Sequence, residues 1–371
     1  MLLNPPESKA LNVGRNASTT YLTKMKKISY LLFFCANIFF AQNSEEANKK
    51  VNEGIDLHDA GKYDEAIAKY NEALVLDKDN PFALSEKAMS LESSKKYDEA
   101  IEISKNILKL YPNDDNKTVY VTYGNALDHS GKTDLALKIY DEGLKKYPNY
   151  YQLYFNKGIT LFNIKKNEDA IKAFQNATKL NPNHTSSFNA LAVLNSSNRV
   201  ASILASSRYL SLDNKSARAK GHLEAIISLM KKGVSQQGDN SISLSIDENT
   251  LNQINKKKKS ENDFSTIDMV LSMSAALDYD EKNKNKTEIE KFADKFKTIC
   301  DALDESKKNQ KGYYWDFLVP YFLEMKNKNL IEPFSNIIFL STSNENALEY
   351  SKQNFEKINK FYEWSKNYSW K

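Results

Sequence analysis

The sequence predicts an all-α protein in which helical hairpins stack in tandem as a solenoid, followed by a C-terminal helical domain. Three observations lead to this prediction. A set of features repeats with a period near 34 residues, which is typical of helical repeats. Apolar residues recur at the i, i+3, i+4 and i+7 spacing of amphipathic helices. The composition is globular rather than disordered, with 41% hydrophobic residues and only 11 glycines and 8 prolines among 371 residues.

Four consecutive units share the repeated features. An alanine recurs at spacings of 34, 36 and 34 residues, at Ala66, Ala100, Ala136 and Ala170. Twelve residues before each alanine lies a small residue, namely Gly54, Ala88, Gly124 and Gly158. Four residues after each alanine lie Tyr70, Ser104, Tyr140 and Phe174. Small residues allow two helices to cross closely, and Gly61 and Gly131 can supply a left-handed turn between them. Each unit is therefore predicted to be a hairpin of two helices.

These residues and their spacing resemble the tetratricopeptide repeat. The resemblance covers residues 43–182, which are predicted to hold four repeats, although Ser104 stands where an aromatic residue is usual. It implies a solenoid in which each hairpin packs on its neighbours, because a single hairpin cannot bury its apolar face alone. Residues 183–232 are predicted to form one degenerate repeat and a capping helix, since terminal repeats are atypical.

The pattern changes after the repeats. Residues 233–262 are predicted to be a linker, in which the alternation over 241–246 indicates one short strand. Residues 263–371 are predicted to be a C-terminal helical domain, and their sequence resembles no family that we recognise. Within this domain, Thr342 and Glu345 fit a capping box at the start of a helix.

The first part of the chain is expected to be a targeting segment rather than part of the fold. Residues 25–42 begin with a basic stretch and continue with thirteen uncharged residues, the layout of a secretory signal peptide. Thirteen residues span about 20 Å as a helix, against about 30 Å for a bilayer core. A cleaved signal is therefore favoured over a stable membrane span, and the mature protein is expected to be periplasmic or secreted in a bacterium. Residues 1–24 are expected to be a non-native or disordered extension.

Charge and cysteine content exclude several classes of protein. The 52 basic residues nearly balance the 48 acidic ones, giving a net charge of +4, which argues against a dedicated nucleic-acid binder. The lysine run over 256–259 has no interleaved aromatic residue and is typical of a solvated linker. Two cysteines cannot form a disulfide-stapled scaffold. Cys300 is expected to be a small buried residue rather than a nucleophile.

No catalytic or metal-binding motif is found. All four histidines precede the C-terminal helical domain, which therefore has no imidazole for a catalytic triad or a metal site. Residues 278–280 begin like a calcium-binding loop, but Lys282 and Ile289 stand where ligands are required. We expect no metal, no cofactor and no enzymatic activity. The alternative is an envelope enzyme whose C-terminal domain is catalytic and whose repeats dock a substrate or partner; it requires carboxylates that converge around Asp316 or Glu324.

The resemblance also implies where a partner binds. In similar proteins the first helices of the hairpins line a concave face that holds a peptide or protein segment. Carried over to this sequence, the contact residues are Asn52, Ile55 and Asp59 in the first repeat, Ser85 and Met89 in the second, Val121, Asn125 and Asp128 in the third, and Phe155, Asn156, Ile159 and Asn163 in the fourth. Asparagine can hydrogen-bond a peptide backbone, and apolar side chains add contact area. The alternatives are that these are ordinary solvated positions or that the C-terminal region covers them.

We therefore expect a non-catalytic protein–protein interaction scaffold of the bacterial cell envelope, with a protein or peptide partner. Relatives that bind chaperones hold a C-terminal carboxylate in a clamp of basic and asparagine side chains. Ile55, Glu86 and Thr122 occupy the corresponding positions here and cannot form that clamp, so this ligand is not expected. A third possibility is a structural protein whose solenoid packs on itself.

Overall fold

The structure is a computed structural model that describes residues 25, 44–237, 241–256 and 260–370. Apart from Met25, the predicted signal peptide over 25–42 lies outside the described residues, as does the predicted extension over 1–24. The described residues are mostly helical and form two compact units, the first ending at Glu142 and the second beginning at Gly143. The prediction of an all-α fold, with a hairpin solenoid followed by a C-terminal helical region, is confirmed. Within the described ranges, no helix is both long enough and apolar enough to cross a bilayer.

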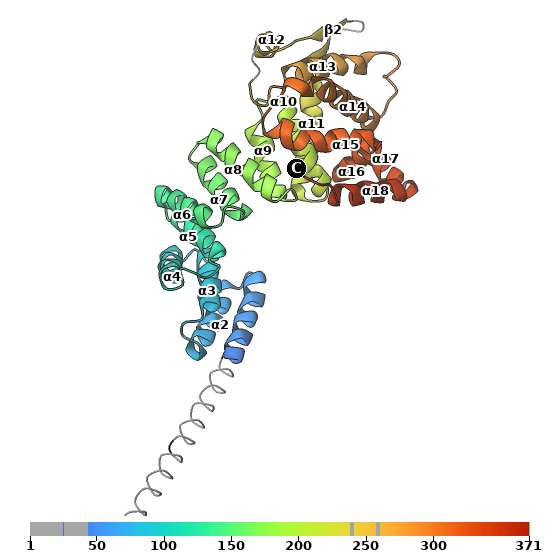
Figure 1. Cartoon of the computed structure of the whole chain (residues 1–371). Coiled ribbons are helices and arrows are strands. Elements are labelled where there is room, and N and C mark those ends of the chain that lie inside the picture. Colours follow the sequence, from blue (N-terminus) through green and yellow to red (C-terminus); the bar gives the residue numbers. More distant parts are fainter. Residues whose placement is uncertain (1–24, 26–43, 238–240, 257–259, 371) are drawn as a thin grey trace, which may run out of the picture. The chain divides into compact units, whose positions relative to one another are not determined.

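The helices of the first unit follow one another as hairpins (Figure 1). They are a helix over 44–59, α2 (Tyr63–Leu76), α3 (Pro81–Ser93), α4 (Tyr97–Leu110), α5 (Lys117–His129) and α6 (Thr133–Lys146), which continues past Glu142. The core of the first hairpin is made of small residues and one aromatic ring: Ala47, Val51, Ala66, Tyr70, Ala73 and Ala83. Small buried side chains let neighbouring helices approach closely, as the repeat pattern predicts.

Glycine faces an aromatic ring in three of the four repeats: Gly54 with Tyr70, Gly124 with Tyr140, and Gly158 with Phe174. A Cβ atom added to Gly124 would lie 2.3 Å from the ring of Tyr140, closer than two carbon atoms can approach without a shift. The second repeat has Ala88 and Ser104 at these two positions. The repeats therefore use either glycine with a large ring or alanine with a small side chain, and both solutions fill the same crossing between helices.

In each of the four repeats, the turn inside the hairpin uses one residue with left-handed backbone. Gly61 and Gly131 have φ angles of 74° and 81°, which confirms the predicted turns. Lys95 and Lys165 take the same conformation, with φ angles of 66° and 64°, although a side chain there costs about 1–2 kcal/mol relative to glycine. The sequence did not indicate these two turns, because only glycine marks a left-handed position clearly.

The second unit also begins with hairpins. Its first helices are α7 (Tyr151–Asn163), α8 (Asn167–Leu180), α9 (Thr185–Leu194), α10 (Arg199–Leu212) and α11 (Ala217–Lys231). Each of these helices packs on the next one. α10 is buried along almost its whole length, because helices from later in the chain cover the side that α9 and α11 leave open.

The segment between α11 and the C-terminal helices contains two strands where the sequence predicts one. β1 (Val234–Gln237) pairs antiparallel with β2 (Ser241–Leu244), so that Val234 lies opposite Leu244. α12 (Glu248–Ile254) follows, and both strands and α12 contact the next helix, α13 (Ser265–Ala276). β1 was missed because its sequence, V-S-Q-Q, has no alternation of apolar and polar residues.

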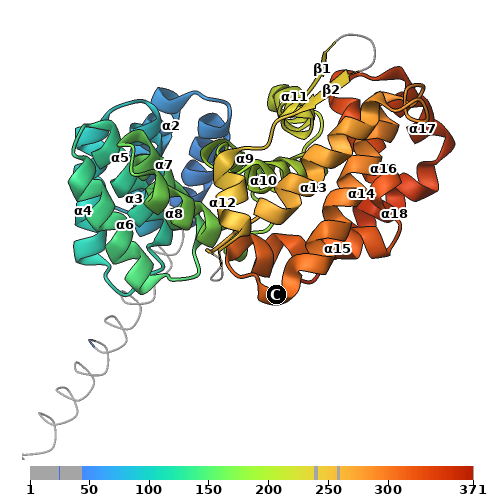
Figure 2. The same cartoon turned by 90° about the horizontal axis from the view of Figure 1, so that it is seen from above.

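The C-terminal helices pack on α10 and α11 (Figure 2). After α13 they are α14 (Glu288–Ser306), a π-helix (Tyr314–Leu318) that leads into α15 (Val319–Asn327), α16 (Ile331–Phe339), α17 (Glu345–Gln353) and α18 (Phe355–Lys366), with short 3-10 turns at Leu277–Tyr279, Lys307–Asn309 and Leu340–Thr342. α13 and α16 both contact α10 and α11. The last repeat helices and the C-terminal helices therefore share one core within the second unit.

The capping box predicted at Thr342 and Glu345 is wrong. Asn344 is the N-cap of α17, and its side chain accepts a hydrogen bond from the first turn. The hydroxyl of Thr342 instead donates to a backbone carbonyl of the preceding helix, because short polar side chains compete for nearby backbone groups. A capping box does form at the start of α14, between Thr287 and Glu290.

Candidate functional site

The predicted contact residues lie on the first helices of the hairpins. The helix over 44–59, α3 and α5 carry eight of them in the first unit, and α7 carries four in the second. None of them is fully buried: Asn52, Asp59 and Asn163 are exposed, and the others are half-buried. These side chains are therefore at least partly accessible, and their role in binding stays a prediction.

Several predicted contact residues already have partners within their own hairpin. The amide oxygen of Asn125 accepts a hydrogen bond from the hydroxyl of Tyr140 at 2.7 Å. Asp128 accepts one from Thr133 at 2.9 Å, and the amide of Asn156 donates to a backbone carbonyl one turn earlier at 2.8 Å. Replacing Asn125 would therefore disturb hairpin packing as well as any binding, because Tyr140 would lose this acceptor.

Two carboxylates on the first-helix face of the first unit have no cationic partner. Asp59 follows one turn after Ile55, and Glu86 lies half-buried on α3. Burial raises the pKa of Glu86, and the negative charge of Asp59 raises it further. Neither carboxylate forms an ion pair with any residue that the structure describes. The face is thus locally acidic.

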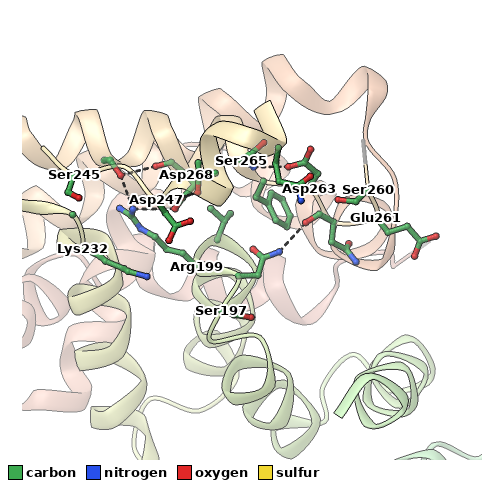
Figure 3. A pocket seen from close by; sticks show the side chains of 18 residues that line it. Ser197, Arg199, Lys232, Ser245, Asp247, Ser260, Glu261, Asp263, Ser265 and Asp268 are labelled. Carbon is green, nitrogen blue, oxygen red and sulfur yellow. Dashed lines mark hydrogen bonds and ion pairs between the residues drawn. The ribbon is translucent and has the colours of Figure 1, made fainter. Parts of the chain in front are cut away.

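A cavity of about 640 Å³ lies within the second unit (Figure 3). Its wall is formed by the start of α10, the ends of the β-hairpin, α12, and the chain from Ser260 to Ser272. Most of its lining is polar, with hydroxyl and amide groups from Ser197, Asn198, Ser245, Thr250, Gln253 and Ser260. The volume falls in the range of small-molecule sites in proteins.

Arg199, the first residue of α10, is the most deeply buried cation of this cavity, with 8% of its surface exposed. Its Nη1 atom donates to the hydroxyl of Ser272 at 2.9 Å and lies 3.2 Å from a carboxylate oxygen of Asp268. Asp268 is held in turn by the hydroxyl of Thr250 at 3.0 Å. In Figure 3 the side chain of Arg199 extends toward the carboxylates of Asp247 and Asp268.

The other two nitrogens of Arg199, Nε and Nη2, have no hydrogen-bond partner among the described residues. Burial lowers the pKa of the guanidinium, while Asp268 opposes this effect. An arginine in a protein keeps its charge at neutral pH, and these two nitrogens are almost completely shielded from solvent. The hydroxyl of Ser265, which also lines the cavity, is likewise buried without a partner.

The charges around the cavity are mixed. Among the described residues, four acidic side chains line it, Asp247, Glu261, Asp263 and Asp268, and two basic ones, Arg199 and Lys232. The N-termini of α10 and α13 also border it, and both are capped by the chain itself: Asn198 accepts from the first turn of α10, and Asp263 accepts from the backbone of Ser265. The described part of the lining is therefore polar and carries side chains of both charges.

The sequence did not indicate this cavity, since its walls come from segments predicted to be a capping helix, a linker and a C-terminal domain. One signal was present in the composition. Only four of the 52 basic residues are arginine, at positions 15, 199, 208 and 218, and Arg199 and Arg208 are both buried. Arginine is thus rare in this chain, and two of its four arginines are buried on α10.

The two carboxylates named by the enzyme alternative each accept a hydrogen bond from a neutral donor. Asp316 accepts a hydrogen bond from the backbone of Gly312 at 3.1 Å, and Glu324 accepts one from the indole of Trp364 at 2.8 Å. Among the described residues, no group of three or more His, Cys, Asp or Glu side chains is placed to hold a metal ion. Cys300 is fully buried, as predicted, and burial raises the pKa of its thiol.

Comparison with known protein families identifies which residues form the repeats. Family models of the tetratricopeptide repeat match residues 54–88, 91–156 and 151–184. The first part of this chain is built of tetratricopeptide repeats. The recurring alanines and the glycine–aromatic pairs are the residues that carry this identity. No curated protein sequence matches the chain.

Solved structures of other tetratricopeptide-repeat proteins show weak likeness. A thermophilic TPR protein of Thermus thermophilus is 18% identical, with a TM-score of 0.43, and the match covers 49% of this chain and 99% of that one. PilF of Pseudomonas aeruginosa is 19% identical, with a TM-score of 0.41, covering 51% and 90%. YrrB, described as a TPR protein with an unusual peptide-binding site, is 21% identical, with a TM-score of 0.36, covering 50% and 95%.

Proposed function

We propose that this protein is a non-catalytic interaction scaffold, and that the first-helix faces of its repeats hold a peptide or protein segment. The observation that supports the proposal is the partial exposure of the apolar side chains on those faces. Ile55, Met89, Val121 and Ile159 are half-buried, and Ile55 packs against the core of the first hairpin, so part of each side chain remains accessible. Partly exposed apolar groups beside hydrogen-bonding groups such as Asn52 support peptide binding.

We further propose that the protein acts outside the cytoplasm of a bacterium, in the periplasm or beyond it. The support is the order of charges and apolar residues over 25–42, which is that of a signal peptide. The test is mass spectrometry of the protein recovered from fractionated host cells. We expect a mature chain that begins shortly after residue 41 in the envelope or external fraction; a chain that retains residues 25–42 in the cytoplasmic fraction would contradict the proposal.

The binding face is tested by site-specific crosslinking in the host. A photo-crosslinking amino acid at Met89 lies on the first-helix face of the second repeat, and the same group at Val75, which is 85% exposed on α2, is the matched control. We expect a defined adduct from position 89 and little from position 75. Equal adducts from both positions, or none from position 89, would rule out this face as the binding surface. An adduct with a second copy of the chain would favour a structural protein whose solenoid packs on itself. Light scattering of the purified protein would then show whether it self-associates.

A further inference from the structure

We propose that the first-helix face of the first unit binds a basic segment of another protein, in which a lysine or arginine side chain pairs with Glu86 on α3. An apolar neighbour of that side chain packs beside Ile55 and Met89. This inference rests on the proposed function, because it names the chemistry of the segment that the repeats hold. It fails by itself if the face binds segments that have no basic residue.

Glu86 differs from the other half-buried carboxylates of the first unit, whose residues 44–142 the structure describes throughout. Each of the others has a partner: Glu53 (Lys50 and Lys69), Asp77 (Asn80), Glu92 (His129) and Asp128 (Thr133). Glu86 has neither a hydrogen bond nor an ion pair with any described residue. A carboxylate that is partly removed from water and has no donor is poorly stabilised, so a cation from a partner would stabilise it.

The surroundings of Glu86 leave its negative charge uncompensated. Burial raises the pKa of Glu86, and the charge of Asp59 on the preceding first helix raises it further. Burial also raises the pKa of Tyr70 to about 12, and Glu86 and Asp59 both add to this shift. Lys87, the next residue on α3, forms no ion pair with Glu86 among the described residues. A cation beside Glu86 would therefore be attracted by two carboxylates.

A partner can reach this position from solvent. Glu86 is half-buried and Asp59 is exposed. The carboxylate oxygens of Glu86 are not among the buried polar atoms that lack a partner, so these oxygens remain open to solvent. Unlike an enclosed group, Glu86 can thus form an ion pair with a side chain that approaches from outside.

Apolar side chains lie one helical turn from each carboxylate. Met89 follows Glu86 by three residues on α3, and Ile55 precedes Asp59 by four on the first helix, spacings that place each pair on the same side of its helix. Both apolar side chains are half-buried. The hydrocarbon stem of a lysine or arginine can lie along such groups while its charged end meets a carboxylate.

The charge of the whole first unit favours the same kind of partner. Residues 44–142 contain 21 acidic and 13 basic side chains. A basic segment would be attracted over a distance and then paired at Glu86, whereas an acidic segment would be repelled in both steps. Charge complementarity therefore selects a basic segment over an acidic one.

The test begins with an unbiased selection of peptides. A random heptapeptide library is selected for binding to the full-length protein, to Glu86→Gln and to Glu102→Gln, which removes an exposed charge from α4 instead. We expect the unaltered protein and Glu102→Gln to enrich peptides in which lysine or arginine stands beside an apolar residue. Glu86→Gln should not enrich them.

A double-mutant cycle then measures the single ion pair. The best selected peptide is compared with a version in which norleucine replaces the basic residue and retains the apolar stem. Calorimetry measures both peptides with the unaltered protein and with Glu86→Gln, whose fold is checked by circular dichroism. We expect each single change to weaken binding at least about fivefold, and both changes together to weaken it no more than either one, because they remove the same pair.

Several results would overturn this inference. Selected peptides without a basic residue, or losses that add in the cycle, would contradict it while the scaffold proposal remains; selection of no peptide at all would contradict both. Free spermidine that binds as tightly as the peptide would make the site one for any cation. Self-association that light scattering detects for the unaltered protein and not for Glu86→Gln would make a second copy the occupant.

Discussion

A single buried arginine joins much of the second unit. Arg208 on α10 is fully buried and forms no ion pair with a carboxylate in the described part of the chain. Its guanidinium donates to side chains or carbonyls of the α8–α9 turn, α10, α15 and α18: Pro182, Asn183, Ser211, Tyr321 and Ser365. The rings of Tyr321 and Trp370 also lie 4.8 Å from it. Aromatic faces and neutral acceptors thus replace a counter-ion.

We expect Arg208→Lys to destabilise the second unit by about 3 kcal/mol, because lysine keeps the charge but cannot reach five acceptors at once. All three tryptophans lie in this unit, at positions 315, 364 and 370, so tryptophan fluorescence during urea unfolding reports on it. Arg218→Lys is the control, since Arg218 is exposed. An unchanged urea midpoint for Arg208→Lys would show that the multiple hydrogen bonds of the guanidinium do not stabilise the second unit.

A second buried residue makes stability depend on pH. His222 on α11 is 8% exposed, stacks on Tyr209 at 4.0 Å, and bonds to Ser206 and Asn189. Burial lowers its pKa to about 4, below the value of about 6.5 in an unfolded chain. As pH falls from 6.5 toward 4, the unfolded chain therefore takes up a proton that the folded chain does not, and stability present above pH 6.5 is lost.

We expect this histidine to contribute a loss of about 3 kcal/mol between pH 7.5 and pH 4. His222→Gln retains hydrogen-bonding groups and cannot titrate, so its Tm should fall less than that of the unaltered protein over the same pH range. The measurement is a pair of calorimetric melts for each protein at the two pH values. Parallel losses of Tm would show that His222 is not the titrating group.

At the scale of elements, the distance between paired helices depends on glycine only where a ring faces it. A Cβ atom on Gly158 would lie 2.8 Å from the ring of Phe174, whereas nothing lies within 4 Å of a Cβ atom on Gly221 in α11. Both glycines are inside helices of the second unit. The same substitution is therefore expected to act in opposite directions at the two sites.

We expect Gly158→Ala to destabilise the protein by about 1–3 kcal/mol, because the ring or the helix must move. Gly221→Ala should stabilise it by about 0.5–1 kcal/mol, since alanine has the higher helix propensity and meets no obstacle. Thermal melts followed by circular dichroism measure both. If the two variants shift Tm in the same direction, the glycine–ring contact does not set the helix spacing.

At the scale of the whole molecule, charge is unevenly divided along the chain. Residues 44–142 contain 21 acidic and 13 basic side chains, whereas residues 143–371 contain 26 acidic and 34 basic ones. The net charge of +4 hides this division. The first repeats are therefore acidic, and Asp59 and Glu86 place carboxylates on the face proposed to bind a partner, where a basic segment would be attracted.

We expect a fluorescent lysine–alanine peptide to bind the protein more tightly than a matched glutamate–alanine peptide. Asp59→Asn with Glu86→Gln should weaken this binding at least about fivefold, because both charges lie on the face proposed to bind a partner. Glu99→Gln with Glu102→Gln removes two exposed charges from α4 instead and should change it little. Fluorescence anisotropy at low salt measures all four combinations, and equal weakening by both double variants would mean that only the overall charge attracts the peptide.

The sequence alone determined the repeats, their hairpin form and the residues at their helix crossings. Each repeat contacts its neighbours through the same positions, so the same local sequence pattern occurs several times along the chain. The small and the aromatic residues of these crossings recur in the sequence, whereas the contact of each glycine with a ring is seen only in the structure. The sequence did not predict the left-handed backbone at Lys95 and Lys165, because only glycine clearly indicates such a conformation.

Only the tertiary structure decided the surroundings of Arg199 and Arg208, the cavity and the pairing of β1 with β2. Arg199 and Ser272 are separated by 73 positions, and Arg208 and Ser365 by 157. Contacts between such distant residues occur once and leave no period in the sequence. Burial removes water as a hydrogen-bond partner, so a buried guanidinium must find its acceptors within the protein.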